Sequence, residues 1–102
     1  MTAIWQIKAS KEVLSLRWQD YEDVSIVYQP SSSETHVFNE ITSTTISLLE
    51  NPFSDIAQLH RKLTEELEIG LDELGINDVN FVVGRLEELG LIDWLETEHP
   101  DS

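Results

Sequence analysis

The sequence predicts an α+β fold in which a three-stranded antiparallel meander precedes a three-helix bundle. Hydrophobic and polar residues alternate from residue 13 to residue 39, which is the period of strands with one buried face. After Asn39 the hydrophobic period changes to 3.6, the period of amphipathic helices. A run of strands followed by a run of helices is typical of proteins whose helices pack on one face of a small sheet.

The three strands are predicted from alternation and from turn chemistry. Residues 14–18 alternate leucine and tryptophan with polar residues, and the acidic run 20–23 that follows indicates a turn. Residues 24–29 alternate in the same way and predict the second strand. A proline and three serines at 30–33 are typical of a hairpin loop, so residues 34–38 are expected to form a short third strand.

The first two helices are predicted between start and stop signals. Asn39 is expected to cap the first helix, which ends at Asn51-Pro52 because a residue before proline avoids helical angles. Ser54 is expected to cap the second helix. The connection 70–75, which begins and ends with glycine, then leads to the third helix.

The third helix is predicted to begin at an Asn77 cap, with Asp78 at its positive end, and to stop at Gly90. Residues 91–94 then predict a last short strand. The apolar stripe of this helix comprises Val79, Val82, Val83, Leu86 and Leu89.

The length of 102 residues predicts one domain. We expect an N-terminal extension at 1–11, the folded domain at 12–95 and a C-terminal tail at 96–102. No segment approaches the roughly 20 apolar residues of a membrane span, and the first residues lack the pattern of a secretory signal. These features predict a cytoplasmic protein.

Charge and composition exclude several classes of function. Twenty acidic residues against six basic ones give a net charge of −14, which repels nucleic-acid phosphates and anionic lipids. Fourteen of the acidic residues follow Leu49, in the helical part. The chain has no cysteine, which excludes disulfides, thiolate metal sites and cysteine nucleophiles.

Nothing in the sequence resembles catalytic machinery. His36, His60 and His99 fall in three different segments and have no metal-ligand spacing, so ordinary surface or partly buried histidines explain them. The sequence contains neither a nucleophile elbow nor a phosphate-binding glycine loop. We therefore expect a protein that is not an enzyme and that needs no metal or cofactor.

Two surfaces are candidates for binding. The third strand is expected at the sheet edge, where unpaired backbone groups form a template for an incoming strand; alternatively, its shortness and Glu34 protect it. Phe81 lies off the core stripe beside Arg85 and indicates a contact surface. Alternatively, Phe81 covers the loop 71–76, and Arg85 forms a surface ion pair with Glu88 or Asp78.

Several short motifs occur in an order that resembles the PqqD family. They are the run Thr35-His36-Val37-Phe38-Asn39, the pair Leu48-Leu49, and the stretch from Leu86 to Gly90-Leu91-Ile92. Together with Leu14, Leu16 and Trp18, they look most like the HPr-rel-A system peptide chaperones. The first helix departs from the family in having serine and threonine where alanine is favoured, and Phe81 stands where a polar residue is usual.

This resemblance implies a winged-helix-like RiPP recognition element. Such proteins bind the leader segment of a ribosomally made precursor peptide and present it to a modifying enzyme, here a peptide-modifying or kinase-related enzyme of the same system. The leader adds to the third strand and lies against the third helix, and the acidic second helix is a candidate contact for the enzyme. The residues implied by this match are Thr35, His36, Val37, Phe38, Asp78, Phe81, Val82 and Arg85.

Two other functions stay open at this point. A winged-helix DNA-binding regulator would share the fold, and the third helix offers Asn80 and Arg85 for base contacts. The acidic residues Asp78, Glu87 and Glu88 on the same helix oppose this function. The third candidate is an interaction module that forms a homodimer through the exposed edge or through Phe81.

Overall fold

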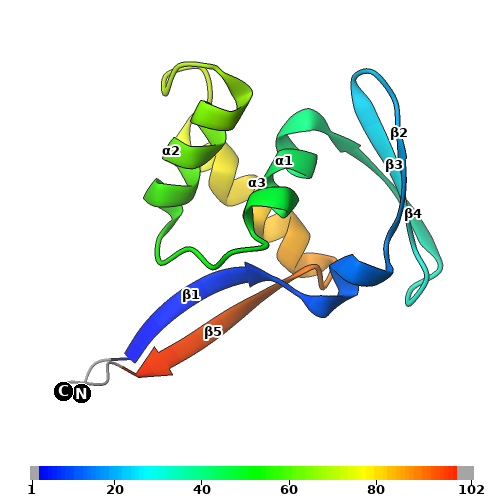
Figure 1. The fold of residues 1–102 in the computed structure, drawn as a ribbon, viewed down its shortest axis with the longest axis horizontal. Coiled ribbons are helices and arrows are strands. Elements are labelled where there is room, and N and C mark those ends of the chain that lie inside the picture. Colours follow the sequence, from blue (N-terminus) through cyan, green and yellow to red (C-terminus); the bar gives the residue numbers. More distant parts are fainter. Residues whose placement is uncertain (1–2, 99–102) are drawn as a thin grey trace.

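The computed structural model describes residues 3–98, with side chains described for residues 5–95. It is an α+β fold with three helices and a three-stranded antiparallel sheet, as predicted (Figure 1). The elements in chain order are β1 Ala3–Ala9, the 3-10 helix η1 Lys11–Ser15, β2 Arg17–Asp20, β3 Val24–Gln29, β4 Glu34–Asn39, α1 Glu40–Leu48, α2 Ile56–Leu67, α3 Ile76–Glu88 and β5 Ile92–Glu98.

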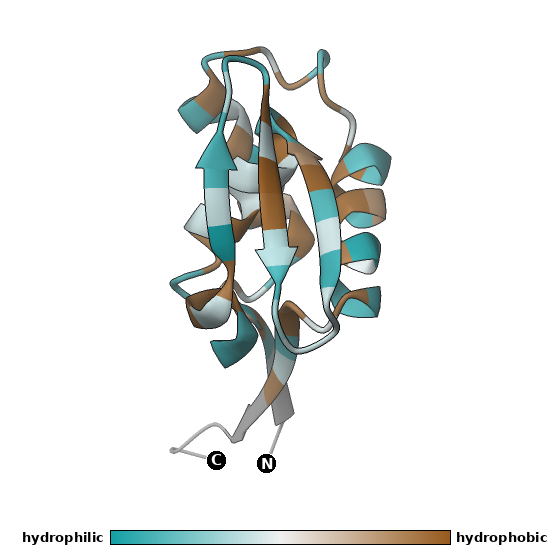
Figure 2. Ribbon diagram, turned by 90° about the vertical axis from the view of Figure 1, so that its right-hand side faces the viewer, coloured by the Kyte–Doolittle hydropathy of each residue, from teal (hydrophilic) through white to brown (hydrophobic). Residues whose placement is uncertain are grey.

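The three-stranded sheet has the order β2-β3-β4, so β3 is central and β4 lies at an edge, as predicted. In the register, Gln29 lies opposite Glu34, and Val27 lies between Trp18 of β2 and His36 of β4. One face of the sheet is covered by α1, which contacts both β3 and β4. The hydropathy view shows the central strand as the most apolar of the three (Figure 2), as expected for a strand flanked on both sides.

The helix starts differ in part from the sequence expectation. Asn39 caps α1 as predicted, since its Oδ1 accepts the Thr42 N–H at 2.9 Å. Asp55, not Ser54, caps α2 through a 2.7 Å bond from the Gln58 N–H, because a carboxylate there is a stronger acceptor than the neighbouring hydroxyl. No helix within residues 3–98 is long and apolar enough to cross a membrane.

The helix α3 begins earlier than expected, with Gly75 at the cap position instead of Asn77. The reason is that Asp78 folds back and accepts the Gly75 N–H at 3.0 Å, which fixes the first turn two residues upstream. After the helix, Gly90 has φ +75°, the left-handed stop that the sequence predicts.

The first strand of the meander begins later than predicted and extends into the expected turn, to Asp20. The Ser10 side chain accepts the Glu12 N–H and turns the chain into η1, so the strand begins only at Arg17. Leu14 consequently lies on the surface with 88% of its area exposed, although Leu16 still reaches the core.

Residues 1–11, expected to be an extension, contain the strand β1, and the expected tail at 96–102 is strand up to Glu98. The two strands pair antiparallel as a ribbon that projects from the molecule (Figure 1). Ile7 anchors the ribbon, because it is fully buried and its backbone exchanges two 2.9 Å bonds with Phe53. The ribbon is therefore part of the fold, and residues 99–102 lie outside the described residues.

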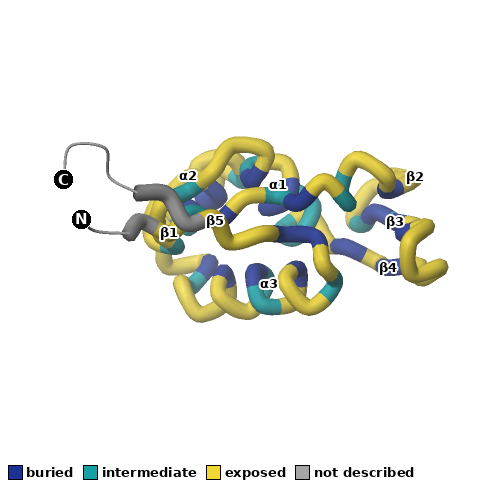
Figure 3. The backbone as a smooth tube through the Cα atoms, turned by 90° about the horizontal axis from the view of Figure 1, so that it is seen from below, coloured by how far each residue is buried: buried dark blue, intermediate teal, exposed yellow. Residues whose placement is uncertain are grey.

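The hydrophobic core lies between the sheet, the helices and the base of this ribbon (Figure 3). The helix α3 contributes Val79, Val83 and Leu86 to it, while Val82 and Leu89 of the predicted stripe are partly buried at its margin. The fully buried leucines lie in α2 and α3, just after α1 and just before β5: Leu49, Leu59, Leu63, Leu86 and Leu91.

Candidate functional site

The open edge of β4 offers backbone groups from alternate residues. The Tyr21 N–H donates to the Val24 carbonyl at 2.8 Å, which makes this pair of the β2–β3 ladder a hydrogen-bonded one. Hydrogen-bonded and non-bonded pairs alternate along an antiparallel ladder, so residues 25, 27 and 29 of β3 turn their backbone groups toward β4.

It follows that residues 34, 36 and 38 of β4 bond to β3. Thr35 and Val37 turn their N–H and C=O groups to the open edge, where no strand of residues 3–98 pairs with them. The predicted strand-addition site therefore has two residues that can each exchange hydrogen bonds with an incoming strand.

The side chains of β4 divide the predicted residues into two sets. His36 and Phe38 are buried on the helix-facing side and stack with ring centroids 5.6 Å apart. Thr35 and Val37 point to the other face, and Val37 is 68% exposed. His36 and Phe38 thus support the strand from within, while Thr35 and Val37 are accessible to a ligand.

A buried glutamine joins this strand to α3. Gln29 Nε2 donates to the Leu89 carbonyl at 3.0 Å, which leaves its Oε1 as acceptor 2.8 Å from His36 Nε2. The chain of contacts fixes β4 relative to the C-terminal end of α3. Gln29 is not among the residues predicted from the sequence, because its only local signal is a polar residue at a strand end.

The helix α3 lies beside β4, on the same side of the molecule (Figures 2 and 3). One flank of the helix faces β5, since Glu87 accepts a 3.1 Å bond from the Trp94 ring. At about 100° per residue, the opposite flank carries the three predicted residues Asp78, Val82 and Arg85. These three side chains therefore lie on the flank of α3 that is turned away from β5.

Arg85 forms the predicted surface ion pair with Glu88, at 3.3 Å. Both side chains are more than half exposed, so the pair contributes little to stability. Arg85 is consequently available to a partner at small cost.

Phe81 is directed away from the core and is 76% exposed, so the alternative in which it covers the loop 71–76 is wrong. It borders a surface depression of about 410 Å³ whose other lining residues are Asn80, Gly84, Arg85 and Glu88. A methyl group added at Gly84 would meet no atom within 4 Å, so packing inside the chain does not require this mid-helix glycine. The depression is separate from residues 35–38, and Arg85 is common to it and to the flank that carries Asp78 and Val82.

A second depression lies beside the opposite sheet edge and was not anticipated from the sequence. It has a volume of about 490 Å³ and lies beside β2, η1 and α1. Its apolar lining includes Leu14, Trp18 and Ile46.

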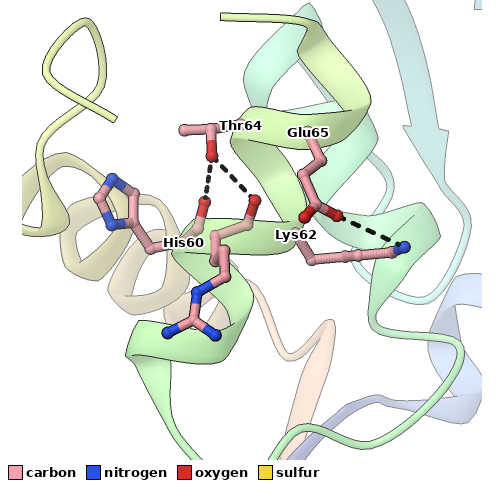
Figure 4. Close-up of polar contacts among 5 residues, drawn as sticks. His60, Lys62, Thr64 and Glu65 are labelled. Atoms are coloured by element: carbon pink, nitrogen blue, oxygen red, sulfur yellow. Dashed lines mark hydrogen bonds and ion pairs between the residues drawn. The ribbon is translucent and has the colours of Figure 1, made fainter. Parts of the chain in front are cut away.

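The helix α2, expected to be acidic, carries balanced charge, because Arg61 and Lys62 stand against Glu65 and Glu66. Lys62 and Glu65 lie 3.7 Å apart, and the buried Thr64 hydroxyl donates to the carbonyls of residues 60 and 61 (Figure 4). With balanced charge, α2 has no electrostatic feature that favours it as the contact for a modifying enzyme.

The two described histidines have structural partners. His36 contacts Gln29, and the His60 ring donates to the Leu74 carbonyl, tying α2 to the loop before α3. Within the part of the chain that the structure describes, no group of three His, Asp or Glu residues could hold a metal ion. His99 lies outside that part.

Neither a protein-family model, nor a curated protein, nor a solved structure matches this chain.

Proposed function

We propose that this protein is a non-catalytic adaptor that binds an extended peptide segment by strand addition to β4. The observation that carries the proposal is the outward-facing backbone of Thr35 and Val37 on a six-residue edge strand. An added strand gains main-chain hydrogen bonds, and side chains beside the edge supply selectivity. The buried support from His36 and Phe38 keeps the strand ordered before the ligand arrives.

The proposed peptide continues from β4 over α3. Asp78, Val82 and Arg85 form the flank turned away from β5, and Arg85 leads to the depression bordered by Phe81. In this arrangement the strand supplies affinity through its backbone, while the helix discriminates between sequences.

The resemblance to the PqqD family suggests what the peptide is. The order of three strands and three helices supports a winged-helix-like RiPP recognition element, with β1 and β5 as an additional ribbon. On this proposal, the ligand is the leader of a precursor peptide in the cytoplasm. The partner that receives it is a peptide-modifying or kinase-related enzyme.

A DNA-binding regulator is the weaker candidate. A recognition helix needs cations for phosphate contacts, whereas Arg85 is the single basic residue of α3. Asp78 and Glu88 lie on the same side of this helix as Arg85 and would face the duplex with it.

Replacement of Val37 by proline tests the proposal. Proline at residue 37 removes an N–H that faces the open edge, so no bond to β3 is lost. Edge strands tolerate proline at such positions. The ligands are synthetic peptides covering the short reading frames beside the gene, and amide shifts in residues 34–39 and 78–86 locate the binding. We expect Val37→Pro to weaken the complex about two- to twelve-fold, since it removes one backbone bond worth about 0.5–1.5 kcal/mol. Val37→Ala keeps that bond and should weaken the complex less than Val37→Pro.

The matched pair Trp18→Pro and Trp18→Ala makes the same comparison at the β2 edge. Equal affinities of the two Trp18 variants support addition at β4. Unchanged binding by Val37→Pro, or salt-sensitive binding of duplex DNA without any response to peptide, would contradict the proposed function.

A further inference from the structure

Glu34 lies at the end of β4 that is closest to the C-terminus of α3. It pairs across the sheet with Gln29, whose side chain reaches the Leu89 carbonyl. Side chains alternate along a strand, so Glu34 is on the same helix-facing side as His36 and Phe38. Glu34 therefore lies at the end of the edge strand that is next to the C-terminus of α3.

The charge that the described residues place at this end is negative. The C-terminus of a helix carries a partial negative charge, and Glu34 adds a full one. Glu88 is balanced by Arg85 at 3.3 Å, and Glu87 faces β5. Among the side chains that the structure describes, ion pairs join Lys62 to Glu65 and Arg85 to Glu88, and Glu34 belongs to neither.

The geometry of strand addition brings one ligand residue to this point. Peptide residues opposite Thr35 and Val37 point to the outer face, whereas those opposite Glu34 and His36 point toward the helices. Directly opposed residues in a sheet have Cβ atoms about 4.5–5.5 Å apart, within reach of an ion pair. The ligand side chain opposite Glu34 thus enters the negative end of the site.

We infer that the site selects peptides with lysine or arginine at the position that lies opposite Glu34. This inference rests on the proposed function and specifies its ligand: an extended peptide, basic at one end of the added strand. Glu34 is then a specificity-determining residue. A glutamate or aspartate in the peptide at that position is rejected by like-charge repulsion.

The test uses an mRNA-displayed library of random 14-residue peptides, selected on the immobilised full chain in parallel with four variants. Val37→Pro reports whether binding occurs by strand addition. Glu34→Gln removes the local charge, and Glu34→Lys reverses it. Glu66→Gln on α2 changes the net charge by the same amount as Glu34→Gln, but at the end of the molecule away from the sheet (Figure 1).

We expect lysine or arginine to be enriched at one fixed position of the selected peptides. The enrichment should be lost with Glu34→Gln, be replaced by acidic residues with Glu34→Lys, and persist with Glu66→Gln. The affinity of a selected peptide should fall about two- to five-fold with Glu34→Gln, as expected for one cross-strand charge pair. This difference should shrink at high salt.

The two ideas fail in different ways. If the selection yields no peptides that are enriched on the wild type relative to Val37→Pro, the proposed function is refuted. The specificity of Glu34 is then refuted with it. Enriched peptides that need Val37 but show no basic position, or keep it with Glu34→Gln, would overturn the inference about Glu34 and leave strand addition intact. Glu34 is exposed, and circular dichroism of each variant verifies that it is folded.

Discussion

The sheet has two open edges, and they offer different things to a partner. The edge strand β4 has six residues, and its helix-facing side chains His36 and Phe38 are buried. The edge strand β2 has four residues, all exposed, and carries a charge at each end, Arg17 and Asp20. Short, charged edge strands are how natural sheets avoid unwanted pairing. The contrast indicates that β4 is the edge suited to strand addition.

What lies beside each edge differs as well. Beside β4, the Gln29 side chain connects the strand to α3 and so fixes a helix flank next to an available backbone. Beside β2 lies the apolar depression that includes Trp18 and the exposed Leu14. The first edge presents backbone groups, and the second presents apolar side chains. A sheet edge becomes a specific peptide site only where available backbone groups are combined with a fixed neighbouring element.

The largest difference between the edges should appear in stability. Phe38→Ala is expected to lower the free energy of unfolding by about 3–5 kcal/mol, the usual cost of truncating a buried phenylalanine. Trp18→Ala should cost about 1–2 kcal/mol, because Trp18 is partly exposed and packs on Phe38 at a centroid distance of 6.1 Å. Urea denaturation monitored by circular dichroism measures both. An equal loss in the two variants would show that both edges are anchored to the same extent.

A smaller difference concerns the polar connections behind the edges. Gln29→Ala leaves the Leu89 carbonyl and His36 without their partner, so it should cost about 1–3 kcal/mol. It should also speed hydrogen exchange in β4 and in the last turn of α3. Asp20→Ala breaks the 2.7 Å bond from the Ser25 hydroxyl behind β2. We expect it to lower the free energy of unfolding by only about 0.5–1 kcal/mol. Exchange in β4 that does not change with Gln29→Ala would disprove the coupling between strand and helix.

The sequence was sufficient where local chemistry decides the structure. The alternation in 24–29, the serine-rich loop and the Asn39 cap correctly predicted the meander and the first helix. The exposure of Phe81 and the pairing of Arg85 with Glu88 followed from helical periodicity. These features depend on residues a few positions apart, which a pattern search can detect.

Features that depend on distant residues were missed. The strand β1 alternates Trp5, Ile7 and Ala9 with polar residues, a signal that was present, but its partner β5 lies at the other end of the chain. Likewise, the pairing register, not the composition of β4, decides which of its residues face outward. The Gln29 connection also requires α3 to end beside β3, which no local pattern shows.

The smallest effect on stability is expected at Gly84 of α3. This substitution tests whether the bound peptide contacts α3 or only β4. Glycine in a helix interior costs about 0.5–1 kcal/mol relative to alanine, and the space above Gly84 is empty. Gly84→Ala should therefore stabilise the free protein by that amount in urea denaturation. The new methyl group would partly fill the depression beside Phe81, so peptide affinity should fall several-fold in the same variant. Gly90→Ala is the comparison for stability: its φ of +75° makes alanine destabilising there. If Gly84→Ala stabilises the protein and leaves peptide affinity unchanged, the peptide ends at β4 and does not reach the outer face of α3.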